Sequence, residues 1–449
     1  MSPAPGRARL RAWNWLASAT LAVVAVIAAD AWLTSPARVE PAPALDPAAI
    51  RPGFGPATFA AALAASDATV DGARVTLATH PGEWLRLEVL ARALAARHRL
   101  TADAADLAEA ERLLERALAI APWPAGPALT AAEVSLAVHD LDGAERSLAR
   151  FDASAVPAPP DEQAVAGSLR CEIAFQRGDL PRARQLCSGG DLGSLLRRAN
   201  LAAKSGDTGA AVRIVETELR RPRLAPQAFA TLALQRASLA LATGDWEAAG
   251  AWARAAERAF PGYWLSEAYL AQQLALEGDP AGATRRYTEL ARRTGDPDVL
   301  DALARLAEAD GQAAEARRWA AQAGAAWQQR ARLLPITYAT HHAEHLLLHG
   351  DPRRALALAQ ADYARRPYSG TIVHYAYALW RSGEPARALA VVRHGEARGF
   401  VTAEMKLVEA VSLGSLGRAA EAGTALAAAR RLNPRIDSQR QQFVAFGRD

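Results

Sequence analysis

A short histidine-rich run offers the clearest candidate chemistry in the sequence. Residues 341–345 read His-His-Ala-Glu-His, so His341, Glu344 and His345 match the H-x-x-E-H arrangement, in which two histidines hold zinc and a glutamate moves a proton. His341 and His345 share one face of a helix, and His349 extends that row by another turn. A five-residue motif with no distant third ligand is weak evidence. The pattern favours histidines that line or flank a surface, with a zinc-binding hydrolase as the alternative.

The rest of the sequence offers little further chemistry. It contains no Gly-x-Gly-x-x-Gly or Walker sequence and no serine in a Gly-x-Ser-x-Gly elbow. The net charge of +4 is small for 449 residues, and the arginines alternate with carboxylates, as on solvated helix faces. We therefore expect no nucleic-acid partner and no cofactor.

A repeat organises most of the chain. In eight successive units a glycine is followed five residues later by an alanine in the same register, and most successive alanines of this set lie 33 or 34 residues apart. The pairs are Gly178 and Ala183, Gly206 and Ala211, Gly244 and Ala249, Gly278 and Ala283, Gly311 and Ala316, Gly350 and Ala355, Gly383 and Ala388, and Gly417 and Ala422. A small residue stands twelve positions before each alanine: Cys171, Ala199, Ala237, Ala271, Ala304, Ala343, Ala376 and Ala410. Spacings that recur in one register indicate a repeated structural unit.

Each position of this unit has a physical role. Glycine lets the chain leave a helix in a left-handed conformation. The aspartates that follow five of the glycines can accept hydrogen bonds from the first amides of the next helix. The small residues allow the two helices to approach closely. Proline, as at Pro261 and Pro367, ends the second helix. The unit is therefore a helix–turn–helix pair, and the alanine-rich chain is predicted to be all-α.

This pattern closely resembles the tetratricopeptide repeat, a helix–turn–helix unit of about 34 residues. The resemblance covers residues 83–434, or about ten units, if two less regular ones around Ala110 and Ala144 are included. It is to the membrane-anchored bacterial type of this family. It implies a right-handed superhelical α-solenoid whose first helices line a concave groove.

The resemblance also implies which residues face that groove: those two before and one after the first small residue of each unit. In units six to nine this gives the partner-binding candidates. They are Tyr269, Gln272, Arg305, His341, Glu344, His374 and Tyr377, with Trp380 one turn beyond Tyr377. An aromatic and charged groove favours an extended peptide or a partner loop. The alternative is partial burial of these side chains beneath neighbouring helices.

The only two cysteines fall in the third unit. Cys171 takes its first small position, and Cys187 lies four residues beyond Ala183 on the second helix. Antiparallel helices packed at small residues can bring the two within disulfide range. The alternative is two buried thiols that serve as small apolar groups.

The N-terminus carries a targeting signal. Residues 1–12 hold three arginines, and the apolar stretch 13–33 that follows is long enough to span a bilayer, with tryptophan near both ends. Because basic residues stay on the cytoplasmic side, this single transmembrane helix places the rest of the chain outside the cytoplasm. A signal peptide cleaved near Ala29–Ala31 is the alternative, and it would also export the array.

The remaining segments connect or end the array. Residues 34–56 are rich in proline and predict an extended spacer. Residues 57–82 look irregular and predict an N-terminal cap with at most one short helix. Residues 435–449 predict a C-terminal capping segment, since the last repeat of a solenoid needs cover.

Together these features predict a non-enzymatic protein–protein interaction scaffold or adaptor. We expect it at the inner membrane, with the array facing the periplasm or cell exterior and binding a peptide or an envelope protein in its groove. Release into the periplasm after signal cleavage is the alternative location. If the topology is inverted, a cytoplasm-facing regulatory adaptor follows instead.

Overall fold

The computed structural model describes residues 45–48, 53–187, 190–221 and 224–447. The chain divides into two compact units, Met1–Asp46 and Pro47–Asp449, and every helix described below belongs to the second. The predicted basic N-terminus (1–12), the predicted membrane helix (13–33) and most of the predicted linker (34–56) lie outside the described residues. Within the described ranges, no helix is both long and apolar enough to cross a bilayer.

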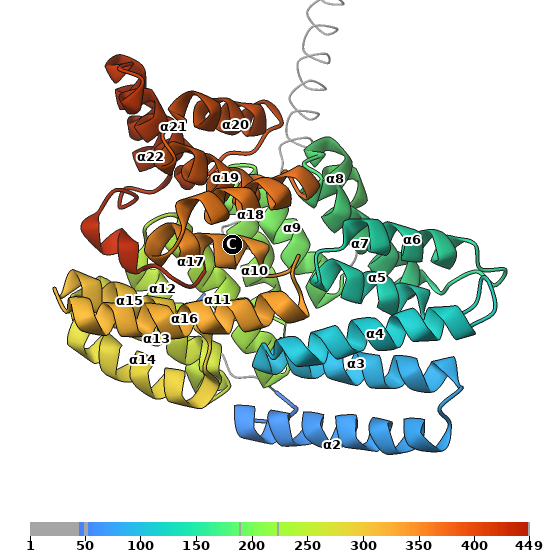
Figure 1. Cartoon of the computed structure of the whole chain (residues 1–449). Helices are drawn as coiled ribbons and strands as arrows, with labels where there is room; N and C mark the ends of the chain where they lie inside the picture. Colours follow the sequence, from blue (N-terminus) through green and yellow to red (C-terminus); the bar gives the residue numbers. More distant parts are fainter. Residues whose placement is uncertain (1–44, 49–52, 188–189, 222–223, 448–449) are drawn as a thin grey trace, which may run out of the picture. The chain divides into compact units, whose positions relative to one another are not determined.

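The second unit is built from α-helices stacked side by side (Figure 1). Helix α2 (Phe59–Thr79) comes first, and ten helix pairs follow it. The pairs are α3 (Trp84–Thr101) with α4 (Ala104–Ile120), α5 (Ala128–Ala137) with α6 (Leu141–Asp152), α7 (Pro160–Gln176) with α8 (Leu180–Leu186), α9 (Leu192–Lys204) with α10 (Thr208–Leu219), α11 (Pro226–Ala242) with α12 (Trp246–Ala259), α13 (Trp264–Glu277) with α14 (Pro280–Thr294), α15 (Pro297–Ala309) with α16 (Ala313–Leu333), α17 (Ala339–His349) with α18 (Pro352–Arg365), α19 (Ser369–Arg381) with α20 (Pro385–Ala397), and α21 (Ala403–Ser415) with α22 (Ala419–Leu432). A short 3-10 helix, η1 (Gln439–Phe443), comes last. The prediction of an all-helical solenoid is confirmed: the described part of the chain holds no β-strand and one isolated bridge, between Ser205 and Val401.

The turns inside the pairs follow the predicted chemistry. Gly244 and Gly278 have φ of 76° and 98°, a conformation that side chains with a Cβ resist. The aspartate after each of these two glycines caps the next helix: Asp245 accepts a hydrogen bond from the amide of Ala248 at 3.0 Å, and Asp279 accepts one from Gly282 at 2.8 Å. These two turns therefore depend only on residues that are close together in the sequence.

Gly350 departs from that role. Its φ is −132°, so the turn between α17 and α18 contains no left-handed glycine. Space explains the residue instead, because a Cβ at this position would lie 2.6 Å from Cδ2 of Leu346 and 3.1 Å from its Cα. The glycine permits close approach rather than an unusual backbone angle.

The small residues of the repeat lie where paired helices touch. All eight at the first position are buried, and so are the alanines at the second position except Ala422, which is half-buried. Ala376 and Ala388 are fully covered, with an exposed fraction of 0%. A larger side chain at these positions would push the paired helices apart.

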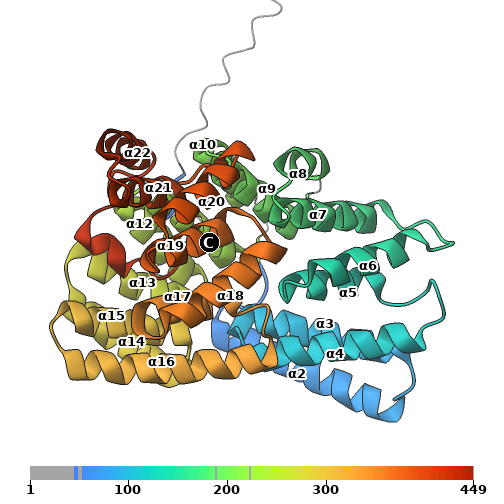
Figure 2. The same ribbon diagram turned by 45° about the horizontal axis from the view of Figure 1, so that its top comes forward.

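Pairs distant in sequence also meet, so the array coils back on itself. Trp327 of the long helix α16 packs in one cluster with Leu94 of α3 and Leu107 of α4, and Figure 2 shows α16 reaching that first pair. Phe175 of α7 contacts Phe400, which follows α20, with 5.8 Å between ring centres. These two contacts join the first helix pair to the seventh and the third helix pair to the ninth.

The prediction of an irregular segment at residues 57–82 is wrong. Most of it is α2, capped by Thr58, whose hydroxyl accepts from the amide of Ala61 at 3.2 Å. The alanines of this segment favour a helix, whereas its β-branched residues and Gly72 are poor helix formers, so the sequence alone does not decide between helix and irregular structure. Packing supplies the stability: Val70 and Ala73 are buried in the cluster that includes Leu94 of α3.

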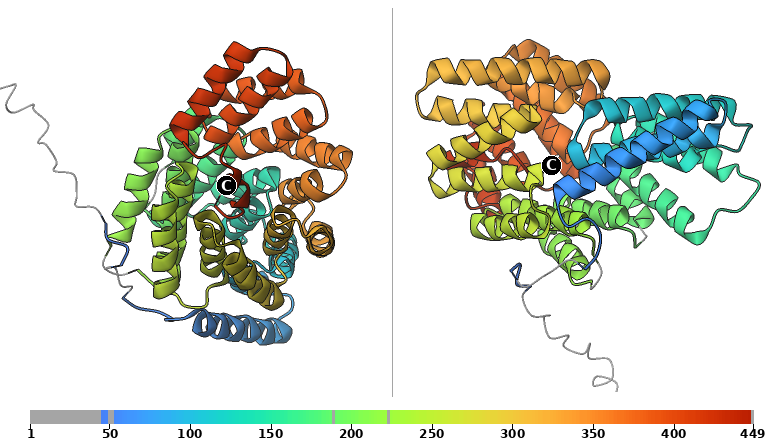
Figure 3. Two further views of the ribbon diagram at one scale, coloured as in Figure 1. Left: turned by 90° about the vertical axis from the view of Figure 1, so that its left-hand side faces the viewer. Right: turned by 90° about the horizontal axis from the view of Figure 1, so that it is seen from below.

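The structure of the C-terminal segment, described up to residue 447, also differs from the cap that the sequence predicts for residues 435–449. Ile436 does cover the last pair, where it packs with Ala403 and Ala429. Beyond η1, however, the chain turns inward, and residues 445–447 lie among the helices, where they line a cavity (Figure 3). Contacts that no repeat pattern encodes hold it there, as described below.

The two cysteines are joined. A disulfide links Cys171 of α7 to Cys187, the residue after α8, with 5.0 Å between their Cα atoms, and no free cysteine remains in the chain. Cys171 keeps the buried small position that alanine holds elsewhere. The bond closes a loop with a sequence separation of 16, which is worth about 3 kcal/mol in the chain-entropy view.

The helix contacts at small residues can be tested with two arginine substitutions in α20. We expect Ala388→Arg to lower the free energy of unfolding by about 3–5 kcal/mol, because it overfills a closed contact and buries a charge. Ala390→Arg, at an exposed position of the same helix, is the control and should cost less than about 0.5 kcal/mol. Equal denaturation midpoints for the two variants would show that the assigned register is wrong.

Candidate functional site

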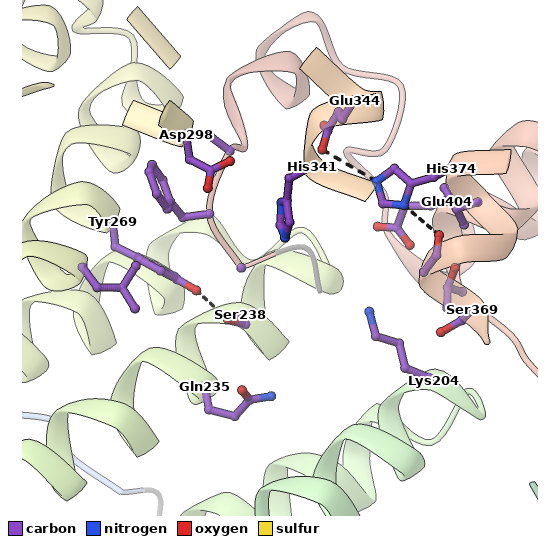
Figure 4. A pocket seen from close by; sticks show the side chains of 17 residues that line it. Lys204, Gln235, Ser238, Tyr269, Asp298, His341, Glu344, Ser369, His374 and Glu404 are labelled. Carbon is purple, nitrogen blue, oxygen red and sulfur yellow. Dashed lines mark hydrogen bonds and ion pairs between the residues drawn. The ribbon is translucent and has the colours of Figure 1, made fainter. Parts of the chain in front are cut away.

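The first helices of seven consecutive pairs surround one cavity of about 310 Å³ (Figure 4). Helices α9, α11, α13, α15, α17, α19 and α21, together with the residue that caps α21, supply its helical wall. The lining residues are Lys204, Gln235, Ser238, Leu265, Tyr269, Asp298, His341, Glu344, Ser369, Gly370, Val373, His374, Thr402, Glu404, Ala445, Phe446 and Gly447. A cavity of this size fits a few residues of a peptide or a small molecule.

Four of the predicted groove residues share this cavity: Tyr269, His341, Glu344 and His374. They come from α13, α17 and α19, and Figure 4 shows the histidine rings facing the open space between the helices. The Tyr269 hydroxyl lies 2.7 Å from Oγ of Ser238, which fixes the tyrosine ring at one side of the cavity.

The other four predicted residues lie elsewhere. Gln272 and Arg305 contact the C-terminal segment of the chain. Tyr377 and Trp380 pack on each other with ring centres 5.6 Å apart, and the indole N–H of Trp380 donates to Ser415 at 3.0 Å. These two aromatic residues do not line the cavity.

Glu344 lies beside Arg305 and His374 at the cavity wall. Its Oε1 lies 3.4 Å from a terminal nitrogen of Arg305, and its Oε2 lies 3.7 Å from Nε2 of His374. The other ring nitrogen of His374, Nδ1, is 2.8 Å from the carbonyl oxygen of Gly370. Since a carbonyl only accepts, Nδ1 carries a proton and donates it there, and this bond fixes the ring orientation.

His341 is held by stacking. Its ring lies almost parallel to that of Trp327, with an interplanar angle of 7° and 5.5 Å between centres. The Trp327 N–H donates to Asp301 at 2.8 Å, so the indole that supports His341 is itself fixed. The ring of His341 is therefore oriented before any ligand arrives.

Asp298 is an acid of the cavity with a shifted pKa. Burial raises its pKa to about 7; His341 and Arg330 act against this rise, and the carboxylates of Asp296 and Asp301 add to it. The group changes charge near neutral pH, so the charge of the cavity depends on pH in that range.

The histidine row does not form a metal site in this structure. His341 faces the cavity, whereas His345 and His349 line a separate hollow beside α16. Nδ1 of His345 lies 2.8 Å from Asp301, so that ring already has a partner. Within the described residues, no group of three His, Cys, Asp or Glu side chains is placed to hold a metal ion. The zinc-ligand candidates His341, His345 and His349 are thus divided between two sides of α17.

Sequence reasoning missed part of the lining, although the register contains the signal. Gln235 and Ser238 occupy in the fifth unit the same positions, two before and one after the small residue, that were used for later units. The position six before the small residue, one turn earlier, also lines the cavity: it holds Leu265, Asp298, Gly370 and Glu404. Residues 445–447 have no such signal, since they lie outside the repeat.

Comparison with known proteins finds distant structural similarity. No protein-family model and no curated protein matches the sequence. Similar solved structures include yeast Tom70, with 15% identity, a TM-score of 0.41, and coverage of 85% of this chain and 89% of that one. They also include the TPR domain of P58(IPK), with 16% identity, a TM-score of 0.25 and coverage of 87% and 91%. A third is a Rap protein complexed with competence and sporulation factor, with 12% identity, a TM-score of 0.37 and coverage of 68% and 98%.

At these identities and scores the likenesses carry no conclusion about function. The ten helix pairs, their turns and their buried small residues define an α-solenoid of stacked helix pairs on their own.

The shifted acid predicts a pH-dependent stability. Because folding raises the pKa of Asp298 above the value near 4 of an unfolded chain, its stabilising contribution is present below about pH 4 and is lost as the pH rises through about 7. Asp298→Asn removes this dependence. We expect its free energy of unfolding, relative to wild type, to improve by about 2 kcal/mol between pH 5 and pH 8.

Chemical denaturation at the two pH values measures this difference. Asp310→Asn, at an exposed position just after the same helix, is the control and should differ from wild type by the same amount at both pH values. A pH-independent effect of Asp298→Asn would contradict the shifted pKa.

Proposed function

We propose that this protein is a non-enzymatic interaction scaffold or adaptor that holds an extended segment of a partner protein in the hollow of its helical array. The observation that carries this proposal is the cavity walled by seven successive first helices, since a continuous inner surface of this kind suits a chain rather than a compact molecule. The segment 445–447 of the protein's own chain already borders this cavity, which supports a peptide-like guest.

The lining supports a polar guest with both charges. Glu344, Glu404 and Lys204 place charged groups of both signs at the wall, and His341 and His374 place flat rings there. Backbone amides and carbonyls of a partner would meet acceptors and donors here, and a partner side chain would stack on the rings.

The proposal includes a membrane tether, with the array outside the cytoplasm. Its support is the basic and apolar N-terminal sequence at residues 1–33 together with the Cys171–Cys187 disulfide, since disulfides persist in oxidising compartments. Partners are then other proteins of the cell envelope, and the protein is of the membrane-anchored bacterial type. Signal cleavage, with release to the periplasm, is the remaining alternative to the tether.

Partner capture tests the groove. We expect the double variant His341→Ala with His374→Ala to capture about tenfold less partner protein from solubilised membranes than wild type does. The physical reason is the loss of two oriented rings of the cavity. His394→Ala, an exposed histidine of α20, is the matched control and should capture as wild type does. Equal capture by the double variant would contradict the assignment of the groove.

Topology is a separate prediction. We expect alkaline phosphatase fused after Asp449 to be active in cells, because this enzyme needs the oxidising exterior. In the same cells, Cys171 and Cys187 should resist alkylation until a reductant is added. An inactive fusion with two reactive thiols would favour the cytoplasm-facing adaptor.

A further inference from the structure

The C-terminal segment Gln439–Gly447 occupies the hollow as a bound peptide would. Two fixed points hold its base: Nδ2 of the fully buried Asn433 donates to the carbonyl of Leu241 at 3.3 Å, and Ile436 packs on the last pair. From there the chain passes inward, and Arg305 donates to the carbonyl of Gln442 at 3.3 Å. Figure 3 shows this segment, up to residue 447, among the helices.

Gln272 holds the tip of the segment by its backbone. The side-chain oxygen of Gln272 accepts from the amides of Ala445 at 2.6 Å and Phe446 at 2.8 Å, and its nitrogen donates to the carbonyl of Phe446 at 3.2 Å. Gln272 is only 1% exposed. A buried amide paired with backbone groups alone would hold any chain of suitable shape, whichever protein supplies it.

The side chains next to Gln272 form a site that suits an aromatic residue. Phe446 is 7% exposed and packs between Tyr269 and Tyr287, with ring centres 6.3 Å and 6.2 Å away. The buried hydroxyl of Tyr287 has no hydrogen-bond partner among the residues that the structure describes. The segment therefore fills the aromatic site without satisfying every polar group in it.

The position after the aromatic residue requires glycine. Gly447 has a φ of 82°, and a Cβ there would lie 2.5 Å from the Tyr269 hydroxyl and 2.8 Å from Oγ of Ser238. The order small residue, aromatic residue, glycine thus matches the shape of this part of the hollow.

We propose that segment 439–447 is a displaceable occupant of the partner groove, and that the partner competes for it with an extended segment of the same order: small, aromatic, glycine. This inference rests on the proposed function and names both the class of guest and a form of regulation. Since Ala445, Phe446 and Gly447 also line the cavity, their withdrawal opens the cavity toward Gln272 and Tyr287.

A labelled peptide with the sequence of residues 439–447 tests the proposal against the full chain by fluorescence polarisation. Wild type should bind it weakly, because the internal copy competes. Phe446→Ala releases that copy while leaving Gln272 and the two tyrosines intact, so it should bind the peptide at least about tenfold more tightly. Gln442→Ala changes only an exposed side chain and is the control; it should bind as wild type does.

Two further variants keep the result specific. A peptide with alanine at the position of Phe446 should not bind, and adding Gln272→Ala to Phe446→Ala should abolish the gain. Binding of Phe446→Ala within twofold of wild type, or equal binding of the alanine peptide, would overturn the proposal. Circular dichroism and the melting temperature establish that each variant is folded.

Hydrogen exchange gives a second readout that needs no variant. In wild type, the amides of Ala445 and Phe446 should be protected, and an excess of the peptide should speed their exchange. Unchanged exchange would show that the segment is a permanent part of the fold. If partner capture still depended on His341 and His374 in that case, this inference would fail while the proposed function stood.

Discussion

Close contact between antiparallel helices at alanine is the constraint on which this structure depends. Alanine lets two backbones approach because it carries the smallest side chain that still favours a helix. When the same contact recurs about every 34 residues, each pair sits on the previous one with a similar rotation, and the result is a curved stack. The buried alanines Ala237, Ala271 and Ala376 make this contact in the fifth, sixth and ninth units.

The inner surface follows from that stacking. Residues two before the buried small residue face the hollow in several units, so Gln235, Tyr269, His341 and His374 converge although they are far apart in sequence. Contacts across the coil, such as Trp327 with the first pair, then bring the walls together and turn a shallow groove into a cavity. Burial in this cavity is also what moves the pKa of Asp298 toward neutrality.

The hollow of the array already holds residues 445–447 of the same chain. The concave surface of a helical repeat array is usually open to a partner. Here, Gln272 and Tyr269 already contact backbone and aromatic groups of the same chain. Filling the hollow from within shields buried polar groups from water at a modest entropic cost, since the segment is tethered at Asn433. If the proposed function holds, an outside partner binds only by displacing this segment.

The sequence by itself determined the helix pairs, their turns and the register, because these depend on residues close together in the chain: a glycine, an aspartate cap such as Asp279, and small residues twelve apart. It also placed half of the predicted groove residues at the cavity. Only the tertiary structure decided that α2 is helical, that His345 turns toward Asp301 rather than toward His341, and that Phe446 lies between two tyrosines. Each of these depends on packing between distant segments, and no local spacing records such contacts.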